Sequence, residues 1–269
     1  MKIISNIILL LLCFTGLKAQ EVSVSPARLF FTGAAGQNYT QQLLIHNTGS
    51  EKAIFSSGMM DWRRDSLGNK IYSPSGTLPS SNATWVEVVP NIVEVDPGAK
   101  KEVSVILHVP EKSSGTPRLT NSMLFLTQVN AQRSKVTTPG KTSVGILVKL
   151  EFGIHVYHTP LQNQSKDIAF TAMYLESTKS ASKPKRLAVK VKNTGNVVMD
   201  GFLRLELTAK NSGKELKVPA KALSMLPGDE QVIYQELSED LQGDYLAVAL
   251  LDSGEENTLK IAKKDITLD

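Results

Sequence analysis

The chain has 269 residues, enough for two domains of ordinary size, and its formal net charge is only +4. Its basic residues are spread out, apart from a short cluster at Lys183, Lys185 and Arg186, which speaks against a nucleic-acid-binding protein. The only cysteine is Cys13, so a chain cleaved beyond it has neither disulfides nor thiol chemistry.

The first residues have the pattern of a secretory signal. Lys2 is followed by an apolar run over 3–14, and Ala19 offers a small residue for cleavage. We expect residues 1–19 to be a signal peptide that is removed on export. The run is shorter than the roughly 20 apolar residues that span a bilayer, and no later segment approaches that length, so no stable membrane span is predicted.

The first half of the remaining chain consists of short alternating segments separated by Gly, Pro, Asn and Ser turns. The segments that we expect to form strands cover 21–31, 39–46, 53–61, 84–89, 101–109 and 122–129. No stretch of similar length has a 3.6-residue period, which indicates a chain that is almost entirely β. The charge-dense segment 61–65 is interpreted as a strand end that enters a turn.

One alternating stretch, 144–156, is longer than the others. Its apolar residues share one face: Val144, Ile146, Val148, Leu150, Phe152, Ile154 and Val156. A period of two over this length predicts a single strand. The apolar row is longer than one sandwich core needs, so we expect Ile146, Val148 and Leu150 to be partly exposed and to bind a partner by strand addition. The alternative is a central strand that is fully buried.

The polar segment 159–166 is predicted to link two domains. Beyond it the expected strands cover 168–174, 186–192, 201–209, 230–237, 243–251 and 258–268, with Pro219 and Pro227 between strands.

Two turn signatures occur once in each half of the chain. Asn-Thr-Gly is found at 47–49 and 193–195, and a Pro-Gly turn follows at 97–98 and 227–228. This repetition in the same order indicates two copies of one β plan. The predicted fold class is therefore all-β, with two immunoglobulin-like β-sandwich domains in tandem over 20–158 and 167–269.

The sequence lacks the usual patterns of catalytic and metal-binding sites. There is no phosphate-binding glycine loop, no paired-cysteine motif and no Gly-x-Ser-x-Gly segment. His155 and His158 lie three apart on a predicted strand, so they face opposite sides and are unsuited to sharing a metal ion. We predict neither enzymatic activity nor a metal or cofactor.

The order of several motifs resembles the periplasmic pilus-assembly chaperones of the PapD-like family. These motifs are Val-Ser-Val-Ser-Pro-Ala-Arg-Leu-Phe-Phe at 22–31, the strand into Asn47, the Trp62 segment, 85–90, Glu-Val-Asp-Pro-Gly at 94–98, Met-Leu-Phe-Leu at 123–126 and the alternating end at 154–160. The likeness covers about 140 residues, with a vaguer match in the second half.

The resemblance implies two immunoglobulin-like domains set in an L and a periplasmic location. It also implies pilin-like partners with an unpaired sheet edge, to which the last strand of the first domain is lent, and an outer-membrane usher. The family anchors the partner's terminal carboxylate with an Arg on the first strand and a Lys on the last. Arg28 matches that Arg, whereas His155 stands at the Lys position and Lys149 lies earlier on the same strand.

Two questions stay open at this point. Arg28, between apolar neighbours, is expected to meet an internal carboxylate or to point into the cleft between the domains, unless its stem lies on the surface with its head in water. The segments 65–72 and 93–109 also resemble WxL-interacting surface proteins, which implies a cell-surface scaffold or adhesion protein without chaperone activity.

Overall fold

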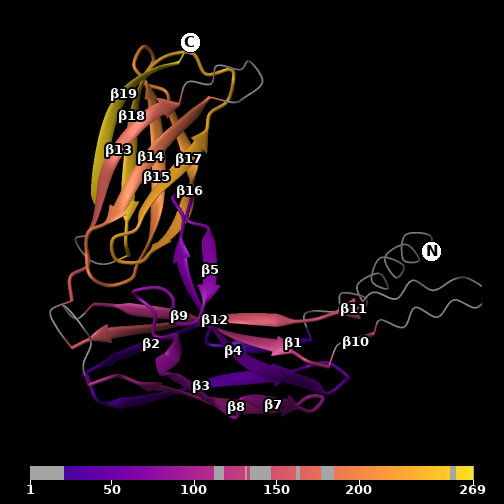
Figure 1. Cartoon of the computed structure of the whole chain (residues 1–269). Helices are drawn as coiled ribbons and strands as arrows, with labels where there is room; N and C mark the ends of the chain where they lie inside the picture. Colours follow the sequence, from indigo (N-terminus) through magenta and orange to yellow (C-terminus); the bar gives the residue numbers. More distant parts are fainter. Residues whose placement is uncertain are drawn as a thin grey trace, which may run out of the picture.

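The computed structural model describes residues 21–111, 118–130, 132–133, 147–161, 164–176, 185–254 and 259–268. These residues form two β-sandwiches that meet at an angle, so that the chain has the outline of an L (Figure 1). Among them no helix is long and apolar enough to cross a membrane. The predicted signal peptide, 1–19, lies outside the described residues.

The first sandwich pairs two sheets. One has the strand order β1 (Val22–Ser25), β3 (Asn38–Asn47), β8 (Lys100–His108) and β6 (Val86–Val89). The other has the order β2 (Arg28–Gly33), β12 (Glu151–Pro160), β9 (Thr120–Gln128), β4 (Ala53–Arg64) and β5 (Lys70–Pro74), and β7 (Ile92–Val95) pairs with the start of β4. A short 3-10 turn, η2 (Ala83–Trp85), precedes β6.

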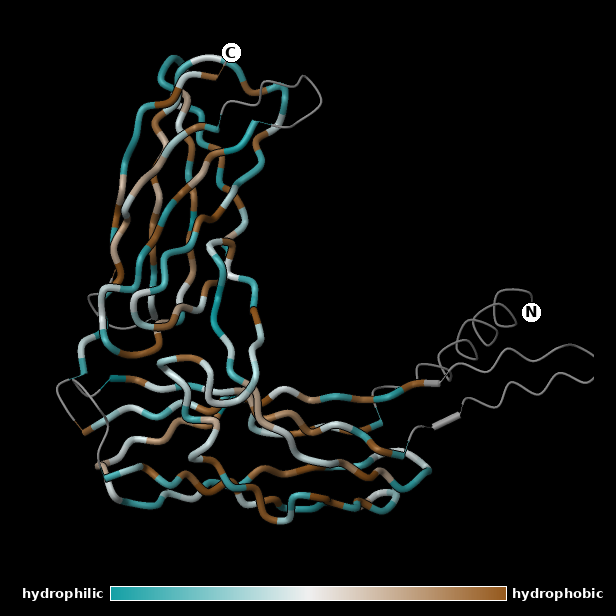
Figure 2. Tube along the Cα trace, in the orientation of Figure 1, coloured by the Kyte–Doolittle hydropathy of each residue, from teal (hydrophilic) through white to brown (hydrophobic). Residues whose placement is uncertain are grey.

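Hydropathy alternates along most of these strands (Figure 2). The inward residues of both sheets form one core, which includes Leu29, Phe31, Leu43, Ile45, Phe55, Val103, Val105, Leu124, Leu126, Ile154 and Val156. This is the alternation expected where two sheets bury one face each against the other.

The second sandwich has seven strands in a three-plus-four arrangement. One sheet has the order β13 (Ile168–Glu176), β14 (Arg186–Asn193) and β17 (Glu230–Glu236). The other has the order β16 (Glu215–Met225), β15 (Met199–Ala209), β18 (Gly243–Asp252) and β19 (Lys260–Leu268). Together with the first sandwich, this confirms the all-β fold class of two immunoglobulin-like domains.

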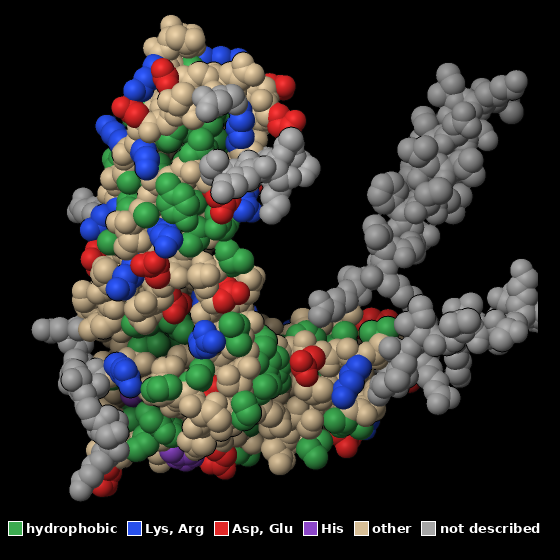
Figure 3. All heavy atoms as spheres, turned by 45° about the horizontal axis from the view of Figure 1, so that its top comes forward, with side chains coloured by type: hydrophobic (Ala, Val, Ile, Leu, Met, Phe, Trp, Pro, Cys, Tyr) green, Lys and Arg blue, Asp and Glu red, His purple; other side chains and the backbone are tan. Residues whose placement is uncertain are grey.

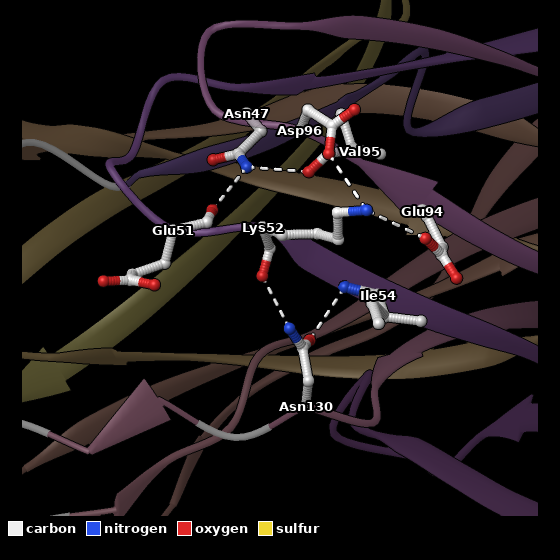
Figure 4. Close-up of polar contacts among 8 residues, drawn as sticks. All are labelled: Asn47, Glu51, Lys52, Ile54, Glu94, Val95, Asp96 and Asn130. Atoms are coloured by element: carbon white, nitrogen blue, oxygen red, sulfur yellow. Dashed lines mark hydrogen bonds and ion pairs between the residues drawn. The ribbon is translucent and has the colours of Figure 1, made fainter.

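The repeated turn signatures contact each other in both sandwiches. The Asn47 Nδ2 atom donates to the carbonyls of Glu51 (2.8 Å) and Val95 (3.0 Å), as Figure 4 shows. The Asn193 Nδ2 atom donates to Val197 (2.9 Å) and Met225 (3.1 Å). Val95 and Met225 each stand two residues before the proline of the Pro-Gly turn. In each sandwich the buried Asn side chain of the Asn-Thr-Gly signature is therefore hydrogen-bonded to the strand that leads into the Pro-Gly turn.

Candidate partner-binding site

The strand β12 has a free edge over its first residues. β2 pairs with β12 in parallel from His155–Arg28 to Pro160–Gly33, and the His155 N–H donates to Ala27 O at 3.0 Å. Residues 151–154 of β12 pair with β9 alone among the residues that the structure describes. The reason is local: the chain before Ala27 forms β1, which belongs to the opposite sheet. Backbone groups at this edge can therefore accept another strand.

The apolar row of β12 leads from the core to solvent. Ile154 and Val156 are buried, Phe152 and Leu150 are half-buried against the same core, and Val148 is 51% exposed. The row is thus neither wholly exposed nor wholly buried, and Val148 is an apolar side chain that its own domain leaves uncovered. Ile146 lies outside the described residues.

The prediction of one strand over 144–156 is wrong in the described part. β11 (Leu147–Val148) and β12 are separate strands, and among the described residues β11 pairs with β10 (Gln132–Arg133) alone, in a two-stranded unit that lies beyond the end of the sandwich in Figure 1. β12 also continues to Pro160, so its end lies within the segment predicted as linker, 159–166.

Asn130 explains the interruption. Its Oδ1 atom accepts the Ile54 N–H at 2.8 Å and its Nδ2 atom donates to Lys52 O at 2.5 Å, which draws the chain after β9 toward β4 (Figure 4). At the same level the Leu150 N–H bonds to the Gln128 side-chain Oε1, at 3.2 Å, instead of a backbone carbonyl. The Gln128 N–H still donates to Leu150 O, at 2.8 Å, and the residue pairing between β9 and β12 begins only with Glu151 and Thr127.

The opposite face of β12 lies against the second domain. His155 is enclosed by Trp62 and Tyr157, with ring centroids 4.8 and 5.6 Å away, and its Nδ1 is hydrogen-bonded to the Tyr157 hydroxyl at 3.0 Å. Trp62, Met123, Tyr157 and Leu119 form an apolar cluster with Leu226, which comes from the second sandwich. Burial lowers the pKa of His155 to about 3, so this imidazole is neutral and does not supply the cation expected at its position.

Arg28 meets a carboxylate of the second domain. It lies beside His155 in register on the same face of the sheet, and its Nη1 atom is 2.6 Å from Asp200 Oδ2 on β15. The two side chains remain 37% and 51% exposed. The structure thus combines two of the expected environments for Arg28: an internal carboxylate, and a position between the domains.

Lys149 lies far from this group. Six residues separate it from His155, roughly 20 Å along an extended chain, and its side chain is exposed. The second cation near Arg28 is instead Lys70 on β5, paired in register with Arg64 on β4. The Lys70 Nζ and Arg64 Cζ atoms lie 6.0 and 5.3 Å from the centroid of the Trp62 ring.

Lys70 was missed by the sequence analysis because β5 was not predicted. Burial, together with the charges of Arg64 and Arg28, lowers the pKa of Lys70. The turn between β4 and β5 fits the interpretation of 61–65, since Asp65 Oδ1 accepts the N–H groups of Leu67 (2.9 Å) and Asn69 (2.8 Å). The turn also reaches the second domain, where the Val232 N–H donates to Ser66 O at 2.7 Å.

A pocket of about 420 Å³ opens beside the Arg28–Asp200 pair. Its lining includes Phe30 of β2, Val198 and Asp200. Phe30 is 51% exposed and stacks on Tyr157 with ring centroids 5.1 Å apart. Figure 3 shows cationic and hydrophobic side chains side by side where the two sandwiches meet. In the described part of the chain no cluster of His, Cys, Asp or Glu is suited to a metal ion.

No family model and no curated protein matches the chain. Among solved structures it is similar to the YadV chaperone, with a TM-score of 0.49, 12% identity, and coverage of 92% of this chain and 100% of that one. It is similar to the Pseudomonas aeruginosa CupB2 chaperone, with a TM-score of 0.47, 14% identity, and coverage of 92% and 100%. It is also similar to a chain from the complex of the Salmonella enterica SafA pilin with the SafB chaperone, with a TM-score of 0.47, 14% identity, and coverage of 94% and 99%. What this chain binds depends on its own residues.

Proposed function

We propose that the chain is a periplasmic chaperone that completes pilin-like subunits by lending them a strand. The observation that carries this proposal is the free edge of β12 at residues 151–154, joined to an apolar row that passes from the core to the exposed Val148. An exported subunit with an unpaired sheet edge is the partner that this surface fits.

The two properties of β12 serve different parts of recognition. The edge offers N–H and C=O groups to a partner strand, which gives affinity with little dependence on sequence. The apolar side chains of Leu150, half-buried, and Val148, 51% exposed, would fill a gap in the partner's core. Subunits would then pass to an outer-membrane usher, which takes them from the chaperone.

Arg28 is the proposed anchor for the end of the partner strand. Arg28 pairs in register with His155, and the free edge begins at the neighbouring residue, Ile154. Arg28 therefore lies at the end of the free edge. A guanidinium at this point can hold a terminal carboxylate through two parallel hydrogen bonds.

The test uses the same substitution at an exposed valine, Val148, and at a buried valine, Val156. Val148→Thr should abolish recovery of a co-produced pilin-like subunit from the same gene cluster and leave the melting temperature unchanged, since Val148 is 51% exposed. Val156→Thr is the control: Val156 is 0% exposed, so burying a hydroxyl there should cost about 1–3 kcal/mol of stability.

The opposite result would contradict the chaperone. If Val148→Thr leaves subunit recovery intact while the purified chain still binds other exported proteins, the chain is a scaffold and β12 is no donor strand.

A further inference from the structure

At the domain junction the described cations outnumber the anions, and most of these charged groups already have hydrogen-bond partners. Arg28, Arg64 and Lys70 supply three cations around the aromatic group of Trp62, His155 and Tyr157, and His155 is neutral. The anions that act on this group are Asp200 and Asp229.

Most of these groups already have fixed partners. Arg64 donates from Nη1 to Gly68 O at 2.7 Å and so belongs to the β4–β5 turn. The Asp229 carboxylate accepts the Leu226 N–H at 2.9 Å and so belongs to the Pro-Gly turn. Asp200 is the carboxylate that meets Arg28, and within the described ranges Lys70 has no carboxylate partner.

We infer that Asp200 is an internal substitute for the partner's terminal carboxylate on Arg28, and that Lys70 is the second cation that favours the incoming carboxylate over Asp200. This inference rests on the proposed function and adds two residues, from β15 and β5, that determine its specificity.

The geometry of the pair suits displacement. Asp200 contacts one guanidinium nitrogen, at 2.6 Å, and within the described part of the chain the other donors of Arg28 form no hydrogen bond. Both side chains are partly open to solvent, at 37% and 51%, so a ligand can reach the guanidinium without unfolding either domain. An exposed ion pair of this kind contributes little to stability, so its loss is readily offset by a ligand that uses two nitrogens.

Lys70 gives the incoming carboxylate its advantage. Asp200 is fixed to β15 and forms no ion pair with Lys70, whereas a carboxylate on a free strand end has no such restraint. Lys70 is exposed, so its attraction for an anion that enters beside it has the modest strength of a surface ion pair. Binding would also remove a link between the sandwiches, because Arg28 and Asp200 belong to different domains.

The experiment uses a synthetic peptide that alternates Val and Thr, with a free C-terminal carboxylate or with a C-terminal amide. We expect Asp200→Asn in the full chain to raise the affinity for the free-acid peptide roughly twofold to fivefold, the range of a partly exposed ion pair, and to leave the affinity for the amide unchanged. Lys70→Met should lower the affinity for the free acid by a similar factor and leave the amide unaffected. Asp265→Asn is the matched control, because it removes the same charge from an ion pair with Lys210 (2.9 Å) elsewhere in the second domain, and no effect on either peptide is expected.

The outcomes separate the inference from the function on which it rests. If Arg28→Ala weakens free-acid binding while Asp200→Asn and Lys70→Met behave like the parent, the anchor stands and the internal substitute is refuted. If Arg28→Ala also leaves the free-acid and amidated peptides bound as in the parent, the carboxylate anchor itself is refuted. If Asp200→Asn raises the affinity for both peptides equally, the pair controls access to β12 and does not imitate a carboxylate.

Discussion

His155 illustrates how a residue's surroundings decide its charge. On a strand exposed on one face, an imidazole beside Arg28 would titrate near its ordinary pKa. Here the second domain covers that face, and Trp62 and Tyr157 enclose the ring. Burial is the largest cause of the lowered pKa, and the charges of Lys70, Arg28 and Arg64 act in the same direction, against that of Asp200.

This lowered pKa predicts a stability that depends on pH. The pKa of His155 falls from 6.5 to about 3 in the folded chain, so the stabilisation is complete above the unfolded value and is lost as the pH falls toward 3. The unfolded chain then takes up a proton that the folded chain refuses, at about 1.4 kcal/mol for each pH unit. Denaturant unfolding of the parent and of His155→Phe over this range should give a steeper loss in the parent. Equal slopes for the two proteins would contradict the prediction.

At the scale of the element, the direction of each backbone group on β12 follows from two hydrogen bonds. The His155 N–H points toward β2, where it meets Ala27 O, and the Leu150 N–H points toward β9, where it meets Gln128. Since N–H groups alternate along a strand that pairs on both sides, those of Glu151 and Gly153 point to the free edge.

Amide hydrogen exchange should reveal this alternation. In the free protein we expect fast exchange at Glu151 and Gly153 and slow exchange at Phe152 and Ile154, which bond to β9. A bound partner strand should slow exchange at Glu151 and Gly153 and change the other two little. Uniform protection of all four amides in the free protein would mean that the edge is already covered.

The strands themselves were largely predictable from alternation. The segments 39–46, 101–109 and 122–129 correspond to β3, β8 and β9 within about two residues, because each has one buried face. β16 was not predicted, since Pro219 suggested a turn. Pro219 lies instead within β16, which is an edge strand. Its pairing with β15 is irregular between the Leu203–Lys221 and Leu205–Val218 pairs, where a missing N–H is tolerated.

The interruption of 144–156 and the junction were beyond the sequence pattern for a common reason. The interruption depends on Asn130 bonding to Ile54, and the junction on Arg28 meeting Asp200, contacts between residues far apart in the chain. Local periodicity contains no information about such contacts. The prediction of one strand over 21–31 is also wrong, since the segment forms β1 and β2, which belong to different sheets, and Arg28 is the first residue of β2.

At the scale of the whole molecule, three kinds of contact among the described residues join the two sandwiches. They are the apolar cluster around Leu226, the Arg28–Asp200 pair and the backbone hydrogen bond from Val232 to Ser66. Apolar burial contributes more to stability than a partly exposed ion pair does, so the angle between the domains should depend chiefly on the apolar cluster.

A pair of leucine substitutions tests this. Leu226 and Leu223 are both 7% exposed, but Leu226 belongs to the junction cluster and Leu223 to the core of the second sandwich. Leu226→Ala should broaden the distribution of overall dimensions in small-angle X-ray scattering with little loss of stability in either domain. Leu223→Ala should lower the stability of the second domain by about 2–4 kcal/mol and leave the dimensions of the folded chain unchanged. A rigid Leu226→Ala chain would show that the polar contacts suffice.

Because Arg28 is in register with His155, an end of a partner strand held by Arg28 would have a fixed position along β12. Side chains of a strand change face at every residue, so an anchor at one end determines which residues of a paired strand face inward along the whole edge. A partner strand lengthened by one residue after its last apolar position would turn its polar face toward the sandwich, whereas a strand lengthened by two would stay in phase. The residues that hold the end of a partner strand would therefore also select partners whose apolar side chains, counted from that end, face the sandwich.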